Sequence, residues 1–431
     1  MKVMNVVGAR PNFMKIAPLI RAMNQYNRAQ GTGCGIQQLL VHTGQHYDYN
    51  MSDSFFSQLE IPAPDINLEI GSGSHAEQTG RIMIEFEKIL LQHKPDLVIV
   101  VGDVNSTIAC SLVASKINYV QSTVHSPRST VSSPLTPASS SPGPCPLNPG
   151  PSPSSPLNPI PCTLNHLHRP LIAHVEAGLR SFDRTMPEEI NRILTDAISD
   201  FLFITEKSAL ENLRREGIPD EKIHFVGNVM IDSLVHSLEK TDSIRLPFVT
   251  NKPFNEYGVV TLHRPANVDR PETLERILDV FNAIAKKLTL VIPLHPRTRK
   301  NIESFGMADK LDEISNYCVI TEPQGYFEML TLIKHAKMVI TDSGGLQEET
   351  TYLGIPCLTM RENTERPSTL QTGTSVLVGN DTGKLMQQVD AILSGNFKKG
   401  TAPELWDGRA AERIIEVLVN WFACRQLNYS P

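Results

Sequence analysis

Short runs of apolar, β-branched residues alternate along the chain with longer stretches in which apolar residues recur at helical spacing. This alternation is typical of a parallel sheet whose strands are joined by crossover helices. The first half predicts strands at KVMNVV, QQLLVHT, DLVIVVGD, LIAHVEAG, FLFITE and IHFVGN. The helices predicted between them cover about residues 11–26, 77–93, 107–116, 187–198 and 208–216.

A second series of strands repeats this organisation. It predicts strands at GVVTLHR, LTLVIPLH, CVITEP, MVITDSGG, IPCLTM and SVLVGN, each followed by a helical or loop stretch. The 431 residues of the chain are more than one hydrophobic core usually serves. We therefore expect two similar α/β halves, joined near residues 227–253.

Residues 121–168 break the pattern, because they are crowded with proline, serine and threonine and have no periodic apolar positions. So few apolar side chains cannot offset the entropy of ordering the chain, which predicts a disordered or polyproline-like insertion. A long surface loop costs little, since loop-closure entropy grows slowly with length. We expect a tolerated insertion without a part in the chemistry; a docking segment for a partner protein is the alternative.

Composition narrows the possible functions. A net charge of −6 gives no general attraction for nucleic acid or an anionic membrane. The apolar start is too short for a signal peptide, and no apolar segment approaches the roughly 20 residues that span a bilayer. The seven cysteines are scattered and lack a C-x-x-C pair, which favours reduced thiols over disulfides or a zinc site. We expect a cytoplasmic protein without a metal, without nucleic-acid partners and without membrane insertion.

Ionisable residues and glycines follow nearly all the predicted strands. In open α/β sheets ligands bind beyond the carboxyl ends of the strands, so this enrichment favours a ligand site at that edge. The residues concerned include Gly8, Arg10, Gly102, Asp103, Glu176, Gly178, His263, Arg264, His295, Asp342, Ser343, Gly344 and Gly345.

The stretch TDSGGLQEE suits a nucleotide. Ser343, Gly344 and Gly345 stand between a strand and a helix, where glycines allow close approach and free N–H groups bind phosphate. Glu348 and Glu349 fall in the first turns of that helix and could accept hydrogen bonds from ribose hydroxyls. The alternative is an ordinary turn with acidic residues stabilised by the helix dipole.

Cations and carboxylates near the same edge suit a phosphorylated sugar. Arg10 and Lys15 frame the first helix start and match the charge of a diphosphate, although each could be a solvated surface residue. Asp103, Glu176 and Glu188 converge if their strands are neighbours, and crowded carboxylates can perform acid/base chemistry. A helix start at Pro187 with a dipole-stabilised Glu188 is the alternative, and spacing alone leaves both open.

Six ordered motifs, GARPNFMKIAPL, VVGDVNST, HVEAGLRSFDRTMPEEINR, VTLHR, TDSGGLQEE and MRENTERP, resemble the non-hydrolysing UDP-N-acetylglucosamine 2-epimerase family. The resemblance covers almost the whole chain outside the proline-rich insertion. It implies a GT-B fold, in which two Rossmann-like domains, here residues 1–228 and 229–408, enclose a cleft. A helix within residues 409–431 is expected to pack back on the first domain.

The resemblance also implies an activity. Family members interconvert UDP-GlcNAc and UDP-ManNAc at C2 by anti-elimination of UDP and re-addition to bound 2-acetamidoglucal, without a cofactor and usually as homodimers. A hydrolysing 2-epimerase that releases UDP and ManNAc is the first alternative. A GT-B glycosyltransferase and a non-catalytic sugar-nucleotide sensor are more distant ones.

Residue by residue, the motifs imply the site. Asp103, Glu176 and Glu188 match the family's catalytic acids, and His263 matches the histidine that assists the departing diphosphate. Which carboxylate is the base and which the acid stays open. The expected substrate-binding residues are Arg10, Lys15, Arg180, His295, Ser343, Gly344, Gly345 and Glu349.

Two positions depart from the family pattern. Some members bind a second UDP-GlcNAc as an activator through a Q-H-x-Q motif, but the chain has Gln45-His46-Tyr47-Asp48 there. Activator control in that form is therefore not predicted. Met329 stands where some members stack a phenylalanine on the base, so the uracil contact is expected to differ.

Overall fold

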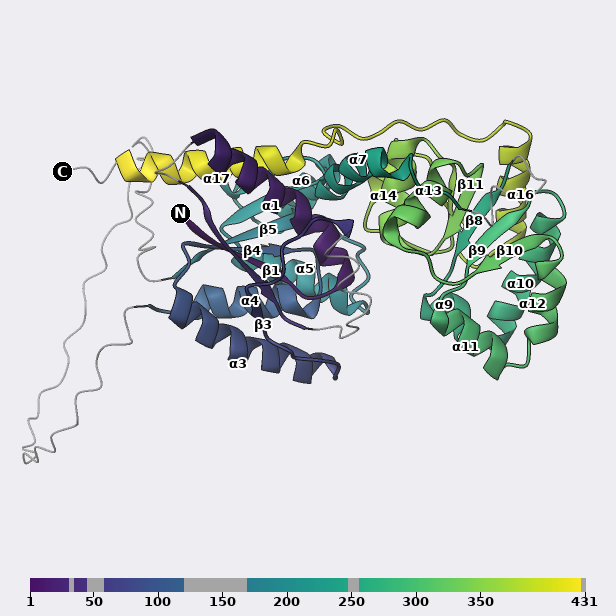
Figure 1. The fold of residues 1–431 in the computed structure, drawn as a ribbon, viewed down its shortest axis with the longest axis horizontal. Helices are drawn as coiled ribbons and strands as arrows, with labels where there is room; N and C mark the ends of the chain where they lie inside the picture. The colour runs from purple at the N-terminus through teal and green to yellow at the C-terminus, as the bar shows by residue number, and fades with distance from the viewer. Residues whose placement is uncertain (31–34, 45–57, 120–168, 247–255, 428–431) are drawn as a thin grey trace, which may run out of the picture.

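The computed structural model describes residues 1–30, 35–44, 58–119, 169–246 and 256–427, so the predicted insertion at 121–168 and residues 45–48 lie outside the described residues. Two parallel β-sheets, each with helices on both faces, form two lobes side by side (Figure 1). We call them the N-terminal lobe and the C-terminal lobe.

The N-terminal lobe is built on a seven-stranded sheet with the order β3-β2-β1-β4-β5-β6-β7. Its strands are β1 (Lys2–Val7), β2 (Gln37–His42), β3 (Ile66–Asn67), β4 (Leu97–Val101), β5 (Leu171–Ala177), β6 (Phe201–Ile204) and β7 (Ile223–Phe225). Its helices are α1 (Arg10–Gln30), α3 (His75–His93), α4 (Asn105–Lys116), α5 (Pro187–Ile198), α6 (Lys207–Arg215) and the short 3-10 helix η2 (Asp220–Lys222).

Side chains on β1 alternate between two buried layers, as period-two strands covered on both faces require. Val3 and Val7 belong to the core beneath α1, while Met4 and Val6 belong to the core beneath α3 and α4. This double burial explains why the strand reads as a nearly continuous apolar run.

The C-terminal lobe repeats the winding with a six-stranded sheet in the order β10-β9-β8-β11-β12-β13, the strand order of a Rossmann fold. Its strands are β8 (Gly258–Thr261), β9 (Leu290–Pro293), β10 (Cys318–Thr321), β11 (Met338–Thr341), β12 (Cys357–Thr359) and β13 (Ser375–Leu377). Its helices are α9 (Pro265–Val268), α10 (Pro271–Ala285), α11 (Pro296–Ser304), α12 (Ala308–Ser315), α13 (Tyr326–Lys334), α14 (Gly344–Leu353), α15 (Pro367–Gln371) and α16 (Thr382–Leu393).

The last helix, α17 (Ala410–Leu427), returns to the N-terminal lobe and lies along α1 (Figure 1). Ile414 and Leu418 are fully buried in the core of that lobe. The carboxylate of Asp232 caps the start of α17 by accepting hydrogen bonds from the amides of Ala410, at 3.1 Å, and Ala411, at 2.7 Å. The predicted α/β class and GT-B arrangement are confirmed.

Strand β3 and helix α7 (Val229–Thr241) are among the described elements that were not predicted. Strand β3 has only two residues, too few to show a period. Helix α7 lies in the predicted join and packs on α1 and α17 as well as on α13 and α14. Because α7 contacts both lobes, the domain boundary after residue 228 stays a prediction. Of the helices that the structure describes, none is long and apolar enough to cross a membrane.

Asp232 should give the docking of α17 a pH dependence. Burial raises the pKa of Asp232 to about 6, although the amides of Ala410 and Ala411 oppose the shift. Since the pKa in an unfolded chain is about 4, the folded protein binds this proton more tightly. The stabilisation is therefore present below about pH 4 and lost as the pH rises through about 6.

Asp232→Asn cannot titrate, so the free energy of unfolding of the wild type should fall relative to this variant between about pH 4 and pH 6. Urea unfolding can be followed by the fluorescence of the chain's two tryptophans, Trp406 and Trp421, which lie just before and within α17. Parallel stability profiles for the two proteins would contradict the assignment.

Candidate active site

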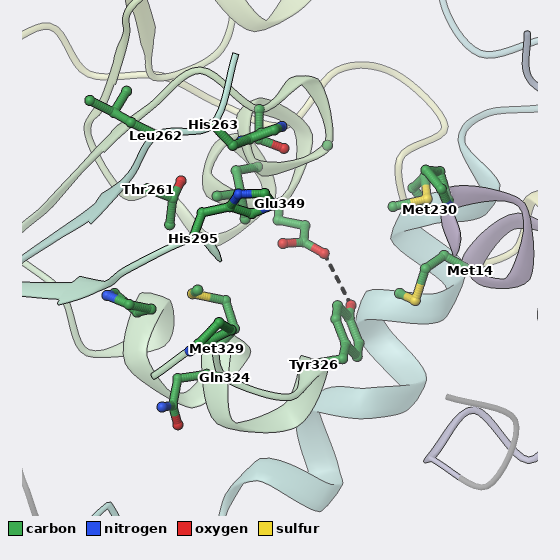
Figure 2. Close-up of a pocket in the computed structure, with 16 residues that line it drawn as sticks. Met14, Met230, Thr261, Leu262, His263, His295, Gln324, Tyr326, Met329 and Glu349 are labelled. Carbon is green, nitrogen blue, oxygen red and sulfur yellow. Dashed lines mark hydrogen bonds between the residues drawn. The ribbon is translucent and has the colours of Figure 1, made fainter. Parts of the chain in front are cut away.

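A cavity of about 330 Å³ lies between the lobes. Pro11 and Met14 of α1 and Met230 of α7 line one side of it, and strand ends of the C-terminal lobe line the other. Figure 2 shows Met14 and Met230 on one side of the cavity, with His263, His295 and Glu349 on the other. The predicted edge of the second sheet thus faces the N-terminal lobe.

The turn after β11 forms part of the cavity wall. Ser343 is the residue before α14, Gly344 and Gly345 are its first two residues, and Ser343 and Gly345 line the cavity. Amides in the first turn of a helix have no partner within the helix, and they carry the positive end of its dipole. This arrangement can bind a phosphate group.

His263 is oriented by Asp342, a buried aspartate of the predicted strand-end edge for which no role of its own was predicted. The Nδ1 atom of His263 lies 2.9 Å from Oδ1 of Asp342, which is fully buried, while the imidazole is 41% exposed. Oδ2 of Asp342 accepts hydrogen bonds from the amides of His263 and Arg264 and from Asn267. Burial acts to raise the pKa of Asp342, but these bonds outweigh it and lower the pKa. An ionised Asp342 fixes the ring so that Nε2 can face a ligand.

Two other predicted residues line the same cavity. His295 precedes α11, accepts a hydrogen bond from the amide of Arg297 at 3.1 Å, and has its ring centroid 5.3 Å from that of His263. Glu349 is buried and accepts a hydrogen bond from the hydroxyl of Tyr326 at 3.1 Å. Burial raises the pKa of Glu349 to about 7, with Glu348 adding to the shift.

Glu176 is presented by an irregular point of β5. The pairing of β5 with β6 shifts register between Val175 and Ala177, and Glu176 has a φ of 73°, which is rare for a residue with a side chain. Lys15 forms a buried ion pair with Oε2 of Glu176. The bulge re-aims the carboxylate away from the regular alternation of the strand.

Asp103 lies beside this pair at the end of β4. Its carboxylate is a quarter exposed and pairs with Arg192 of α5. Burial acts to raise the pKa of Asp103, but Arg192 and Lys15 hold it below the usual range. A Cβ atom on Gly102 would lie 2.7 Å from Nζ of Lys15, so the glycine provides the space for this lysine. Lys15 therefore pairs with Glu176 and also acts on the pKa of Asp103, and the two carboxylates follow the neighbouring strands β4 and β5.

The two glutamates after Pro187 have different surroundings. Glu189 is buried and accepts hydrogen bonds from the amides of Ser181 and Phe182, which fold the preceding loop onto α5. Glu188 is half-buried. Burial and the charge of Arg361 lower the pKa of Arg264, and nearby carboxylates, including Glu188, oppose this shift. Glu188 thus lies near a cation of the C-terminal lobe, while Glu189 holds the loop.

Arg180 is not brought to the cleft, contrary to its expected contact with substrate. Its side chain is 1% exposed and pairs with Asp196 at 2.7 Å and with both carboxylate oxygens of Glu216. Asp196 also lies 2.6 Å from Nδ1 of His174, whose Nε2 is 2.8 Å from the carbonyl oxygen of Gly102. The spacing alone could not show that this arginine belongs to a network behind the site.

Arg366 was not predicted as a site residue, although it lies within the motif MRENTERP, and Glu348 was predicted only as a possible ribose contact. Arg366 contacts Glu176 at 3.2 Å and Glu348 at 2.9 Å, and Asn228 donates a hydrogen bond to Glu348 at 2.8 Å. Burial raises the pKa of Glu348 to about 7, with Glu176 adding to the shift and Arg366 opposing it. The side chain of Arg10, the first residue of α1, lies outside the described part of the structure.

The fold has two Rossmann-like lobes with a cavity between them. A helix start that can bind phosphate, a histidine–aspartate pair and a carboxylate–lysine cluster are typical of enzymes that act on a nucleotide-linked group. A sequence model for UDP-N-acetylglucosamine 2-epimerase matches residues 30–125 and 165–419. The chain belongs to this family.

Related proteins cover nearly the whole chain. It is 39% identical to a UDP-N-acetylglucosamine 2-epimerase of Methanocaldococcus jannaschii, over 97% of this chain and 99% of the relative. It is 36% identical to a UDP-2,3-diacetamido-2,3-dideoxy-D-glucuronate 2-epimerase of Pseudomonas aeruginosa, over the same shares. The crystal structure of Methanocaldococcus jannaschii UDP-GlcNAc 2-epimerase in complex with UDP-GlcNAc and UDP matches with a TM-score of 0.75 and 38% identity, over 97% of this chain and 100% of that one.

Removing Arg180 should destabilise the protein. Arg180→Gln leaves Asp196 and Glu216 without their cation, and breaking a buried ion pair in this way costs about 3–5 kcal/mol of unfolding free energy. Arg215→Gln is the control, since its ion pair with Glu211 is exposed and should contribute less than about 1 kcal/mol. Urea unfolding compares the two variants, and equal losses would refute the structural role of Arg180.

Proposed function

We propose that the protein interconverts UDP-GlcNAc and UDP-ManNAc without net hydrolysis. The observation that carries the proposal is the cluster of Asp103, Lys15 and Glu176, which Arg366 connects to the start of α14. Residues of that helix start and His263 line the cavity. Family membership and the similarity to an enzyme solved with UDP-GlcNAc and UDP support the substrate.

The nucleotide would bind in the C-terminal lobe. The amides of Gly344 and Gly345 would receive the diphosphate, and Ser343 would add its hydroxyl. Glu349 would accept hydrogen bonds from the ribose hydroxyls, and Met329, which lines the cavity, would contact the uracil. Arg10 and His295 complete the proposed substrate contacts. The sugar would then project towards Glu176.

The reaction begins when the bond between C1 and the diphosphate oxygen breaks. His263 would assist UDP as it leaves with the bonding electrons, and the carboxylates would stabilise the positive charge that develops at C1. One of Asp103, Glu176 and Glu188 would then accept the C2 proton, which gives 2-acetamidoglucal. Return of a proton to the other face of C2 and of UDP to C1 completes the epimerisation.

Two related activities remain to be separated from this one. In a hydrolysing 2-epimerase, water would trap the intermediate, and the products would be UDP and free ManNAc. A diacetamido-glucuronate substrate would follow the same chemistry at C2 and is suggested by the relative from Pseudomonas aeruginosa. We further propose a cytoplasmic homodimer, for which exposed apolar side chains on α3 and α5, among them Ile84 and Leu194, offer a contact surface.

Proton and phosphorus NMR of the protein with UDP-GlcNAc in D₂O tests the function. We expect intact UDP-ManNAc with deuterium at C2 and a persistent diphosphate signal. Free UDP with ManNAc would replace the proposal by the hydrolysing activity. Turnover of the diacetamido-glucuronate substrate alone would replace the proposed sugar.

Glu176→Gln should abolish this exchange, because the neutral amide can neither stabilise the positive charge at C1 nor exchange a proton, while the affinity for UDP should change less than about threefold. The matched control is Glu216→Gln, whose carboxylate pairs with Arg180 away from the cavity and whose turnover should persist. Deuterium incorporation at the wild-type rate in Glu176→Gln would remove Glu176 from the reaction.

The affinity for UDP should depend on Glu349. Burial raises the pKa of this group to about 7, and the ionised form, in which both oxygens accept, binds two ribose hydroxyls more strongly than the neutral acid, in which one oxygen carries a proton. Wild-type affinity should therefore rise with pH through about 7, and this component should be missing in Glu349→Gln. Isothermal titration calorimetry with UDP, repeated across this pH range, measures the affinity of both proteins. Protonation of UDP itself affects both proteins equally and cancels when their pH profiles are compared. Equal pH profiles would exclude the ribose contact.

A further inference from the structure

Arg366 joins the proposed catalytic carboxylate to the opposite lobe. It stands just before α15 in the C-terminal lobe, and its side chain is only 10% exposed. Nη2 lies 3.2 Å from Oε1 of Glu176, and Nε lies 2.9 Å from Oε1 of Glu348. Nη1 pairs with Glu365. One guanidinium is therefore shared by three carboxylates.

The two oxygens of Glu176 are held from different lobes. Oε2 pairs with Lys15 of α1, and Oε1 pairs with Arg366. Lys15 and Glu176 belong to the same lobe, so their pair does not depend on the position of the C-terminal lobe. The contact with Arg366 does, and it fixes the rotation of the carboxylate about its last side-chain bond.

The surroundings hold the guanidinium at this point. On the side of the C-terminal lobe, Glu348 anchors Nε of Arg366, and Glu348 is itself held by Asn228. A Cβ atom on Gly344 would lie 2.8 Å from Nη1 of Arg366, so the glycine at the start of α14 leaves the space that the guanidinium occupies. The turn proposed to bind the diphosphate and the arginine that contacts Glu176 are thus in direct contact.

We propose that Arg366 is a positioning residue that aims Glu176 at the sugar from the opposite lobe, with Glu348 as its anchor. This inference rests on the proposed function. Arg366 lies next to the turn at Gly344 and contacts Glu176, so the carboxylate is held directly beside the proposed diphosphate site. The catalytic cluster is complete only when both lobes contribute a cation.

Arg366→Ala tests the proposal. We expect kcat for deuterium exchange at C2 to fall by about 100-fold, the effect of a misplaced reacting group, while the affinity for UDP changes less than about threefold. Added guanidinium, below concentrations that unfold the protein, should raise the kcat of Arg366→Ala at least about tenfold, because it can re-form the charge-assisted pair with Glu176. Arg366→Lys keeps a charge but reaches fewer carboxylates, so its kcat should lie between those of Arg366→Ala and the wild type.

Two further variants complete the design. Arg413→Ala is the matched control, since Arg413 is a partly buried arginine that binds the carbonyl of Val226 and Asp407 away from the cavity. It should keep its kcat and should not respond to guanidinium. Glu348→Gln removes the anchoring charge with little change in shape, so kcat should fall less than in Arg366→Ala, again without loss of affinity for UDP.

The outcomes separate this inference from the proposed function. A wild type without exchange at C2 refutes the proposed function and the inference with it. With an active wild type, a kcat for Arg366→Ala within threefold of normal overturns the role of Arg366 alone. Parallel losses of kcat and UDP affinity without rescue also overturn it, because they would identify a ligand contact or a folding defect. If Arg366→Ala does not fold, Arg366→Lys and Glu348→Gln decide by the same criteria.

Discussion

The pairing of Glu176 with cations from both lobes is the interaction on which the cleft depends. A buried carboxylate without a cation costs several kcal/mol, so Glu176 requires partners wherever it is placed. Lys15 reaches it from α1 and Arg366 from the segment before α15. The left-handed backbone of Glu176 adds a strain of about 1–3 kcal/mol, which such partners help to offset. The full set of partners of Glu176 is therefore present only when the two lobes are in contact.

A second network of buried charged groups supports the pairing of Glu176 with Lys15 and Arg366. The imidazole of His174 joins β5 to the end of β4, because its Nε2 donates to the carbonyl of Gly102, which can only accept. Asp196 and Arg180 continue this network to Glu216 near the surface. Groups that do not line the cavity thus fix the two strand ends that carry Asp103 and Glu176, which keeps the spacing of the carboxylates constant.

Much of the fold could be predicted because its signals are local. Buried parallel strands read as apolar runs, and α5 begins at Pro187 as predicted, since proline suits the first position of a helix. The two-residue strand β3 has no such signal. The residues of helix α7 were predicted only as part of the join between the lobes. The helix packs on both lobes, so its position between the two series of strands resembles that of a linker.

The candidate site divides in the same way. Ser343, Gly345, His263 and Glu349 line the cavity because each follows a strand end of one sheet, which the pattern of strands predicts. Arg180 has the same local signal but turns into the interior. The partner of Glu176 could not be found locally, since Arg366 is 190 residues away and only the packing of the lobes brings it close.

The return of α17 has a consequence for the making of the protein. Ala410, Ile414 and Leu418 are fully buried in the core of the N-terminal lobe, which otherwise ends at β7. A ribosome that adds about 5–20 residues per second needs roughly 10–40 s to synthesise the intervening chain. During that time the apolar face of α1 that α17 covers stays exposed on the nascent lobe. This exposed face can bind chaperones or lead to misfolding. The N-terminal lobe is synthesised before the C-terminal lobe, yet its core is completed only after α17 has been made.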